Sequence, residues 1–356
     1  MNVLSGLYGR ATELRRAWYG RHPHRARRLD RPVVSVGNLV VGGSGKTPLV
    51  AALARLLASA GERPAILSRG YRRRDAAAGV VVVSDGEQVL ATPAQSGDEP
   101  FMLARALPGV PVLVSPDRYL AGRLAERRFA CTVHVLDDGF QHLRLGRDID
   151  LLVLSRADLD ERVLPAGRLR EPLTAARAAG ALMVPGSDED REAVRSRTGA
   201  EVVFGLRAHY QPLRELARAD AVREDAGAPR AVVAVAGIAR PQRFFDALAG
   251  LGYQVVRQIT FRDHHWFSAR DVTAIEQAAA DARCGLIVTT EKDAVRLDAH
   301  VARAVPGSRG GSDNARSTVQ WAVLPLELTI DPAERFASWL AGQLAAARRR
   351  RIEAAA

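Results

Sequence analysis

Short apolar runs alternate with helix-like segments through the first half of the chain. The runs are rich in valine and leucine and show little alternation with polar residues, which is typical of strands buried on both faces. They occupy residues 33–36, 65–68, 111–114, 133–136, 150–154 and 181–184. Apolar spacings of three and four predict helices between them, near 46–60, 100–107 and 118–128. The rhythm predicts a mostly parallel sheet flanked by helices.

Two further patterns complete the predicted fold. Residues 79–92, "GVVVVSDGEQVLAT", read as two strands around an Asp-Gly turn, so we expect an inserted β-hairpin. After about residue 187 the sequence becomes polar, and a second, smaller α/β unit begins near 230, with strand, turn, helix and strand in "RAVVAVAGIARPQRFFDALAGLGYQVV". The segment from Asp331 is predicted to be helical and ends in a basic tail, and 305–317 is predicted to be a surface loop.

The N-terminal 28 residues carry an amphipathic pattern. The apolar residues follow helical spacing along one face, which arginines flank. They are Leu4, Leu7, Tyr8, Ala11, Leu14 and Trp18. Two interpretations remain open and are compatible: a helix docked on its own domain, or a helix lying at an anionic lipid surface.

Composition narrows the partners. The formal net charge is +11, which fits either arginine enrichment or an anionic partner such as phosphate, nucleic acid or acidic lipid. Lysine occurs only at Lys46 and Lys292 among 51 basic residues. Cys131 and Cys284 lie far apart, which favours buried thiols in a reducing compartment. No apolar run is long enough to span a bilayer, and no signal peptide is recognised, so we expect a cytosolic protein or one bound to a membrane from the cytosol.

The turn after the first predicted strand has the chemistry of a phosphate-binding loop. In "VVGGSGKT" glycines let backbone N–H groups face phosphates, and the following helix N-terminus adds positive charge. Lys46 would reach the β- and γ-phosphates, and the Thr47 hydroxyl would bind Mg²⁺. The strict motif fails at its first position, which is Val40. The predicted ATP-binding residues are Val40, Val41, Gly42, Gly43, Ser44, Gly45, Lys46 and Thr47.

Acidic and histidine residues elsewhere supply candidate partners for this loop. Asp137 and Asp138 end an apolar run and could hold a metal directly or through water, or act only as turn residues. Asp98 and Glu99 begin a predicted helix, where they could be capping groups or could accept a proton from an attacking hydroxyl. "FRDHHWF" places a histidine pair beside an aspartate, and a histidine can relay protons near neutral pH.

At this point the sequence resembles the tetraacyldisaccharide 4'-kinases, the lipid A 4'-kinases. The matching segments occur in family order and cover most of residues 1–300. They are "VGNLVVGGSGKTP", "SRGYRRR", "SGDEP", "SPDRYLAG", "LDDGFQHLRLGRDIDLLVL", "LPAGRLREP", "AGIARPQRFF", "FRDHHWFSARD" and "TTEKDAVRL". The family loop likewise lacks its first glycine, so Val40 is no departure.

The resemblance implies a P-loop enzyme of lipid A biosynthesis, bound peripherally to the cytoplasmic face of the inner membrane. It would transfer the γ-phosphate of ATP to the 4'-hydroxyl of a tetraacylated glucosamine disaccharide 1-phosphate, forming lipid IVA. It implies Asp98 as the base, His264 as its partner across a cleft, and Lys46 balancing phosphate charge. Thr47, Glu99 and Asp138 would order Mg²⁺. Which of His264 and His265 faces the centre stays open.

Other motif residues are candidates for the disaccharide or phosphate site. They are Asn38, Tyr71, Arg118, Gln141, His142, Arg168, Arg170 and Glu171. Any one of these arginines could equally be a surface group, and Lys292 could equally cap a helix or pack a domain.

These inferences divide the chain into four parts. We expect a membrane-associating helix at 1–28, a P-loop kinase domain at 29–205, a smaller α/β domain at 206–330, and a C-terminal helix with a basic tail at 331–356.

The rival function is a membrane-attached P-loop ATPase switch that transfers phosphate to no small molecule. A nucleic-acid-binding ATPase would show strongly salt-dependent binding. The sequence has no motif of alternating aromatic and basic residues, so no nucleic-acid partner is expected. No protein partner is predicted either.

Overall fold

The computed structural model describes residues 3–42, 45–71, 73–75, 79–216, 230–304 and 319–355. The chain forms two compact units, and we describe each by itself. The first unit contains residues 1–208 and 328–356, and the second contains residues 209–327. Gly43, Ser44 and the predicted loop at 305–317 lie outside the described residues.

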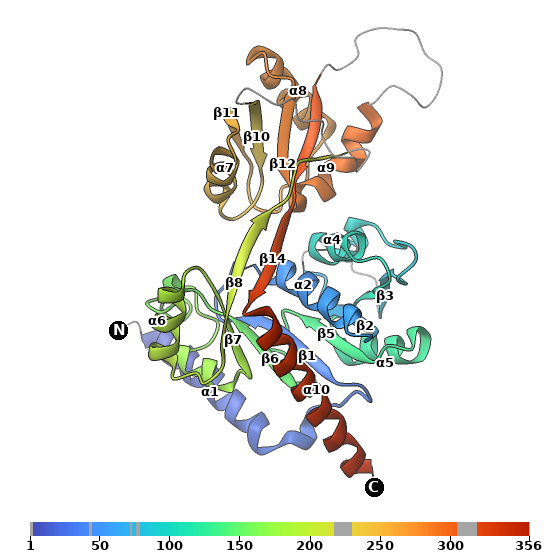
Figure 1. The fold of residues 1–356 in the computed structure, drawn as a ribbon, viewed down its shortest axis with the longest axis vertical. Coiled ribbons are helices and arrows are strands. Elements are labelled where there is room, and N and C mark those ends of the chain that lie inside the picture. Colours follow the sequence, from blue (N-terminus) through green and yellow to red (C-terminus); the bar gives the residue numbers. More distant parts are fainter. Residues whose placement is uncertain are drawn as a thin grey trace. The chain divides into compact units, whose positions relative to one another are not determined.

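A nine-stranded sheet forms the centre of the first unit, and every predicted strand of the first half lies in it (Figure 1). The hydrogen-bonded order is β14-β8-β7-β6-β1-β5-β2-β4-β3. The bounds are β1 Val33–Asn38, β2 Pro64–Ser68, β3 Val81–Ser84, β4 Val112–Val114, β5 Val133–Asp137, β6 Ile149–Val153, β7 Ala181–Pro185, β8 Val203–Tyr210 and β14 Leu326–Asp331. From β8 to β4 neighbouring strands run parallel, so the carboxyl ends of β1, β2 and β5 meet at one edge.

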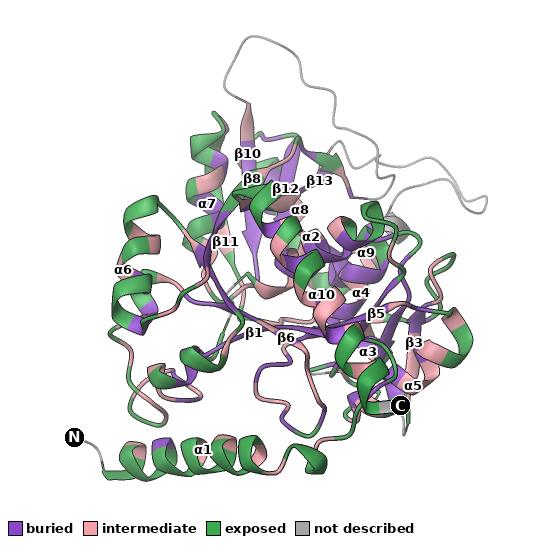
Figure 2. Cartoon of the chain, turned by 60° about the horizontal axis from the view of Figure 1, so that its bottom comes forward, coloured by how far each residue is buried: buried purple, intermediate pink, exposed green. Residues whose placement is uncertain are grey.

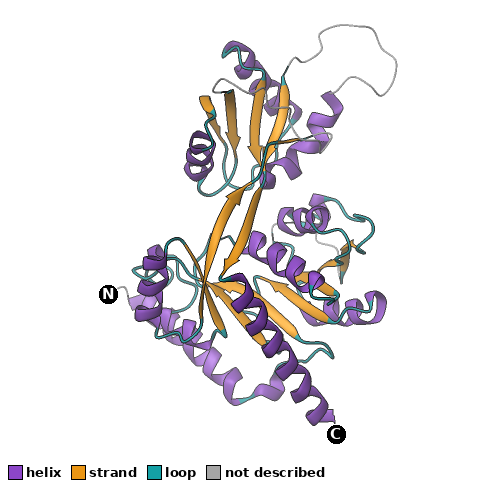
Figure 3. Ribbon diagram, viewed as in Figure 1, coloured by secondary structure: helices purple, strands orange, loops and turns teal. Residues whose placement is uncertain are grey.

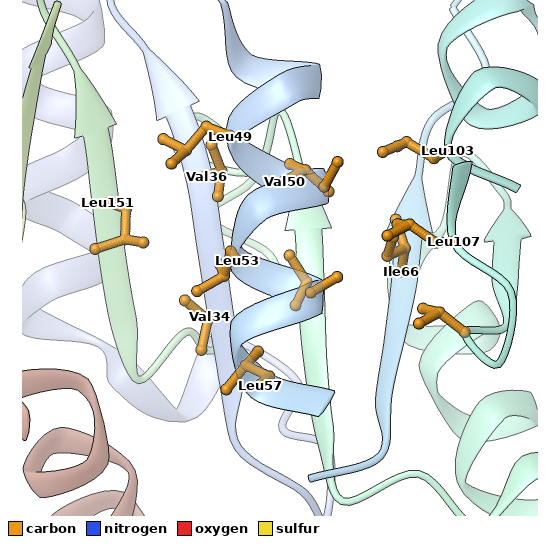
Figure 4. Close-up of a cluster of buried hydrophobic side chains, with 14 of the residues drawn as sticks. Val34, Val36, Leu49, Val50, Leu53, Leu57, Ile66, Leu103, Leu107 and Leu151 are labelled. Atoms are coloured by element: carbon orange, nitrogen blue, oxygen red, sulfur yellow. The ribbon is translucent and has the colours of Figure 1, made fainter. Parts of the chain in front are cut away.

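Helices cover both faces of this sheet, which explains why its strands are apolar throughout. The bounds are α1 Val3–Arg21, α2 Lys46–Ser59, α3 Pro93–Ser96, α4 Asp98–Ala106, α5 Arg118–Phe129, α6 Asp188–Thr198 and α10 Ala333–Ala355, with 3-10 turns η1 Pro23–Arg25, η2 Arg156–Asp158 and η3 Leu173–Ala178. Leu49 and Leu53 of α2, Leu103 of α4 and Phe336 of α10 belong to one buried cluster with β1 and β2, much of it drawn in Figure 4. Helices α5 and α6 pack on the other face.

Helix α1 forms as predicted, but its apolar face points away from the protein. Its one fully buried residue is Gly9, where an added Cβ would lie 3.4 Å from Pro172 Cγ. The side that docks is small and polar, with Ser5 accepting from the Ala166 N–H at 3.1 Å. Leu14 is 69 % exposed, and Figure 2 shows α1 largely in the colour of exposed residues. The helix is therefore docked on its own unit and also presents an apolar surface outward.

Two segments differ in detail from the sequence expectation. β3 pairs antiparallel with β4, but the second arm of the expected hairpin meets the first only at the Ser84–Val89 bridge. The hairpin is therefore little more than a turn, because its returning residues leave the sheet. Helix α6 lies within the polar stretch that the sequence left unassigned, and Ser187 and Asp190 form a capping box at its start.

A five-stranded sheet organises the second unit, in the order β11-β10-β12-β13-β9. Figure 3 shows the helices of this unit beside its strands. The bounds are β9 Arg214–Glu215, β10 Ala231–Ala236, β11 Gln254–Thr260, β12 Leu286–Thr290 and β13 Gln320–Leu324, with helices α7 Pro241–Gly250, α8 Ala269–Asp281 and α9 Glu291–Ala304. β10 is parallel to both β11 and β12, as the strand–helix–strand pattern predicts. Buried clusters lie on both of its faces.

Two further sequence expectations concern cysteines and membrane spans. Cys131 and Cys284 are both free and buried. Among the helices of the described ranges, none combines the length and apolar character needed to cross a bilayer.

Candidate active site

The two described glycines of the turn between β1 and α2 have backbone angles that suit a phosphate-binding loop. Gly42 has φ +112° and Gly45, at the N-cap of α2, has φ +78°. A Cβ at either position would meet nothing within 4 Å, so glycine is needed for its backbone angles rather than for space. Lys46 and Thr47 then begin the helix, whose first N–H groups point toward the turn.

Four side chains from separate segments meet at this turn. The Lys46 ammonium donates to Asn38 Oδ1 at 3.0 Å and lies 3.6 Å from Asp138 Oδ1. The Arg170 guanidinium donates to both Asp138 oxygens at 2.9 Å and also to Asn38 Oδ1. Although partial burial would raise it, the pKa of Asp138 is held below its usual value by Lys46 and Arg170. Asp138 is therefore an ionised carboxylate between two cations.

Main-chain pairing brings Arg170 to this position. The Val41 N–H donates to Arg168 O at 2.8 Å, and the Arg170 N–H donates to Leu39 O at 2.6 Å. Residues 168–170 thus run antiparallel to the chain that leaves β1, with a bridge between Val40 and Leu169. The Arg168 side chain itself pairs with Glu161 at 2.7 Å.

The neighbouring Asp137 has the opposite electrostatic character. Its pKa is raised to about 7, first by burial and then by the charges of Glu99 and Asp138, against the lowering effects of Lys46 and of a hydrogen bond from Ser68 at 3.1 Å. Crowded carboxylates of this kind favour a divalent cation, which would relieve their repulsion. No three-donor metal cluster is preformed within the described ranges. Mg²⁺ commonly uses one or two carboxylates together with substrate phosphates, so the donor set fits it.

Asp98 occupies the start of α4, directly after Gly97 with φ +87°. It is only 6 % exposed. A Cβ on Gly97 would approach Tyr71 O to 3.0 Å, and one on Gly70 would approach Ser96 O to 2.9 Å. The "SRGY" and "SGDEP" motifs therefore pack backbone against backbone. Tyr71, at 60 % exposure, lies beside Asp98's turn with its side chain outward.

The remaining first-unit candidates lie on the segments after β4 and β5. Arg118 is buried at the start of α5; burial, then Arg69, lowers its pKa, while Asp138 and Asp137 oppose the shift. Burial, followed by Arg118, lowers the pKa of His142 to about 4, so this imidazole stays neutral at physiological pH. Gln141 donates to the main-chain oxygen of Asn38 at 3.0 Å, and the side-chain oxygen of the same residue accepts from Lys46.

Glu171 has a partner within the chain that the sequence did not indicate. Arg16 of α1 donates to both its carboxylate oxygens, at 2.7 and 2.9 Å, and to Phe140 O at 3.2 Å. The Arg16 guanidinium also lies 4.1 Å from the centre of the Phe140 ring. Glu171 follows Arg170, and Phe140 lies two residues after Asp138. The contacts of Arg16 therefore support the two chain segments that carry Arg170 and Asp138. Arg16 and Glu171 are 155 residues apart in the sequence, so no local pattern predicts their pairing.

We expect Arg16→Ala to lower the free energy of unfolding by about 1–3 kcal/mol, since a nearly buried Glu171 would lose its charged partner. Urea denaturation measures the change. Arg10→Ala, on an exposed position of the same helix, is the matched control and should stay within about 0.5 kcal/mol of the unmodified chain. Equal unfolding midpoints for the two variants would contradict the docking role of Arg16.

His264 belongs to the second unit, in the turn that follows β11. Its backbone is left-handed, with φ +63°, and its N–H donates to Gly237 O at 3.2 Å. Lys292 Nζ lies 3.1 Å from His264 Nε2. The His265 ring stacks on Phe261, with centroids 4.6 Å apart, and lies 3.3 Å from Asp271. The two histidines of the motif therefore have different surroundings within their unit.

Comparisons with known proteins agree with one another. A family model described as LpxK, tetraacyldisaccharide-1-P 4'-kinase, matches residues 1–345. The tetraacyldisaccharide 4'-kinase of Geobacter sulfurreducens is 42% identical over 317 residues, 85% of each chain. That of Syntrophus aciditrophicus is 40% identical over 314 residues, 83% of each. A crystal structure described as LpxK from Aquifex aeolicus in complex with ATP is similar with a TM-score of 0.76 and 31% identity, covering 96% of this chain and 97% of that one.

Proposed function

The chain belongs to the tetraacyldisaccharide-1-P 4'-kinase family, and from this premise we propose that it transfers the γ-phosphate of ATP to the 4'-hydroxyl of a tetraacylated glucosamine disaccharide 1-phosphate, yielding lipid IVA. The observation that carries the proposal is the meeting of Lys46, Asp138 and Arg170 at the glycine turn that begins α2. The phosphates of a nucleoside triphosphate are bound by cations together with helix N–H groups, and both are present at this turn.

Within this proposal, phosphoryl transfer depends on positioning and charge. Lys46 and the N–H groups at the start of α2 would hold the phosphates, and Arg170 would add positive charge while it orients Asp138. Asp98 would accept the proton of the 4'-hydroxyl as its oxygen attacks the γ-phosphorus, and ADP would leave with the bridging oxygen. For His264, in the second unit, we propose a supporting role in the same proton transfer.

The carboxylates beside this turn fit a bound Mg²⁺ ion. Thr47, Glu99 and Asp138 are the residues that would hold it, with Asp137 close by. The cation would neutralise charge on the β- and γ-phosphates. The raised pKa of Asp137 supports this placement, because the charges of Glu99 and Asp138 contribute to it.

The direct test incubates purified full-length protein with Mg-ATP and the disaccharide 1-phosphate precursor. Mass analysis of the lipid should detect one added phosphate, and γ-labelled ATP should place the label on lipid. Release of the label only as inorganic phosphate would favour the rival ATPase switch and overturn the proposal.

We further propose that the chain attaches peripherally to the cytoplasmic face of the inner membrane through the outward face of α1. This face would enter the interface while the Arg16–Glu171 pair keeps the helix on its unit. Arginines flanking the helix would meet anionic headgroups. An acylated substrate would thereby reach a soluble active site without leaving the bilayer surface.

Replacing Leu4, Leu7 and Leu14 together with serine should weaken binding to anionic vesicles more than 10-fold, since each buried leucine contributes about 1.5–3 kcal/mol. Flotation or sedimentation with vesicles measures this. Turnover on substrate presented in detergent micelles should stay near that of the unmodified chain. Leu251→Ser, an exposed leucine of the second unit, is the matched control. Unchanged vesicle binding by the triple variant would refute the interfacial role of α1.

A further inference from the structure

The turn that carries His264 is held in a strained and well-supported shape. His264 has φ +63°, a region that non-glycine residues seldom occupy. Its N–H donates to Gly237 O, and Phe261 N–H donates to Ala236 O at 2.9 Å. The end of β10 therefore fixes the backbone of this turn, which leaves the imidazole direction to be set by side-chain contacts.

A buried ion pair, Asp293 with Arg296, supports the backbone of the same turn. Asp293 accepts from the Gly237 N–H at 2.8 Å and from the Thr290 hydroxyl at 2.7 Å. Arg296, paired with Asp293, donates to His265 O. Both side chains are fully buried, so the turn rests on a rigid base. That base also holds the first residues of α9, where Lys292 lies.

Lys292 contacts the imidazole directly. Its Nζ lies 3.1 Å from His264 Nε2 and 3.2 Å from Asp263 Oδ1, and both the lysine and histidine side chains are mostly buried. An ammonium has three donors and no acceptor, so a hydrogen bond between these two groups requires Nε2 as the acceptor, and Asp263 Oδ2, 3.8 Å from Nε2, lies beyond hydrogen-bond distance. A neutral imidazole that accepts at Nε2 carries its proton on Nδ1.

The location of Lys292 is unfavourable for a merely structural lysine. It stands in the first turn of α9, at the positive end of the helix dipole, where Glu291 and Asp293 are the expected residue types. Asp263 offsets part of that repulsion. Lysine is also rare in this chain, and its compact ammonium can point at a single ring nitrogen, whereas a planar guanidinium would spread over both neighbours.

We propose that Lys292 is a positioning residue that fixes His264 in its Nδ1–H tautomer. His264 then acts as a hydrogen-bond donor through Nδ1, and Nε2 does not serve as the proton acceptor of the reaction. The inference rests on the proposed function only in taking His264 as a residue of catalysis. Asp263 positions the ammonium, and the Asp293–Arg296 pair positions the turn.

The test reads the tautomer and the turnover separately, in the full-length chain. Nitrogen-15 spectra of histidine-labelled protein distinguish a protonated from an unprotonated ring nitrogen, and the His264 signals are assigned by their loss in His264→Gln. We expect a protonated Nδ1 and an unprotonated Nε2. In Lys292→Met the Nε2–H form should appear, and kcat should fall about 10- to 100-fold, the scale on which loss of a group that orients a functional histidine acts, with KM for ATP unchanged.

Two variants control for general damage. Lys292→Arg keeps a donor and should retain the Nδ1–H signal, but it should restore only part of the turnover because the planar guanidinium spreads over both neighbours. Arg257→Met, on exposed β11, removes a cation elsewhere in the unit and should leave both readouts unchanged. Urea denaturation of each variant checks folding.

Three outcomes separate the possibilities. An Nε2–H tautomer in the unmodified chain, or one unaltered in Lys292→Met, would overturn the inference. A tautomer change with full turnover would refute the catalytic part of it. If the unmodified chain showed the Nδ1–H tautomer but phosphorylated no lipid, the proposed function would fail while the role of Lys292 in setting the tautomer would stand.

Discussion

Replacing Asp98 with asparagine should lower kcat for lipid phosphorylation by about 10²–10⁴-fold, the usual contribution of a general base. Asparagine keeps the size of the side chain and one acceptor oxygen, but its NH2 group replaces the second oxygen and it cannot accept the proton of the attacking hydroxyl. Asp98 lies almost buried at the start of α4. The packing between Gly97 and Tyr71 involves backbone atoms, so replacing the Asp98 side chain should leave it intact. Steady-state kinetics with the disaccharide 1-phosphate measures the change.

Affinity for ATP should hardly change in Asp98→Asn, because the phosphates are held by the separate turn before α2. Nucleotide binding measured by calorimetry is therefore the internal control. Glu87→Gln, a carboxylate in the exposed turn after β3, is the matched control and should keep full turnover. An Asp98→Asn enzyme that turns over at the normal rate would remove Asp98 as the base.

The second large effect is expected for Lys46→Met. Loss of the ammonium removes a charge that would meet the γ-phosphate in the transition state, and removal of one such group costs about 10²–10³-fold in kcat. The variant should still fold, because Arg170 keeps both Asp138 oxygens paired and Asn38 retains donors from Arg170. Turnover at saturating ATP, compared with the urea midpoint, separates catalysis from stability.

Two companions sharpen this experiment. Lys46→Arg keeps the charge but not the compact shape, so it should restore only part of the rate. Arg55→Met, an exposed cation later in α2, removes a positive charge from the same helix without touching the turn. If Lys46→Met and Arg55→Met behaved alike, the assignment of Lys46 to the phosphate site would be wrong.

Much of the fold was predictable because its signals are local. Each strand of the first half is a continuous apolar run, and the helices between them show three-and-four spacing, so both lie close to their predicted bounds. The glycine turn was equally clear, since positive φ at Gly42 and Gly45 demands that residue type. Helix α6 was not predicted because its residues are mostly charged or polar, although a capping box at Ser187 marks its start.

The sequence proposes members of the candidate site, which stay predictions, and it gives none of the pairings between their side chains. Asp137 and Asp138 are indistinguishable in sequence. Burial and the charges of Glu99 and Asp138 raise the pKa of the first, whereas the pKa of the second is lowered, against the effect of burial, by Lys46, Arg170 and Arg118. Likewise the sequence placed Glu171 among substrate candidates, whereas the fold gives its carboxylate to Arg16, 155 residues away.

What the sequence determined by itself is the order of strands and helices, the phosphate turn, the family and the amphipathic character of α1, because each depends on neighbouring residues or on motifs read in order. Tertiary structure alone decided which face of α1 turns outward, how Arg170 reaches Asp138, and that Lys292 meets His264. Those outcomes depend on contacts between segments 28 to 155 residues apart, and such contacts follow from packing and charge in three dimensions rather than from any local pattern.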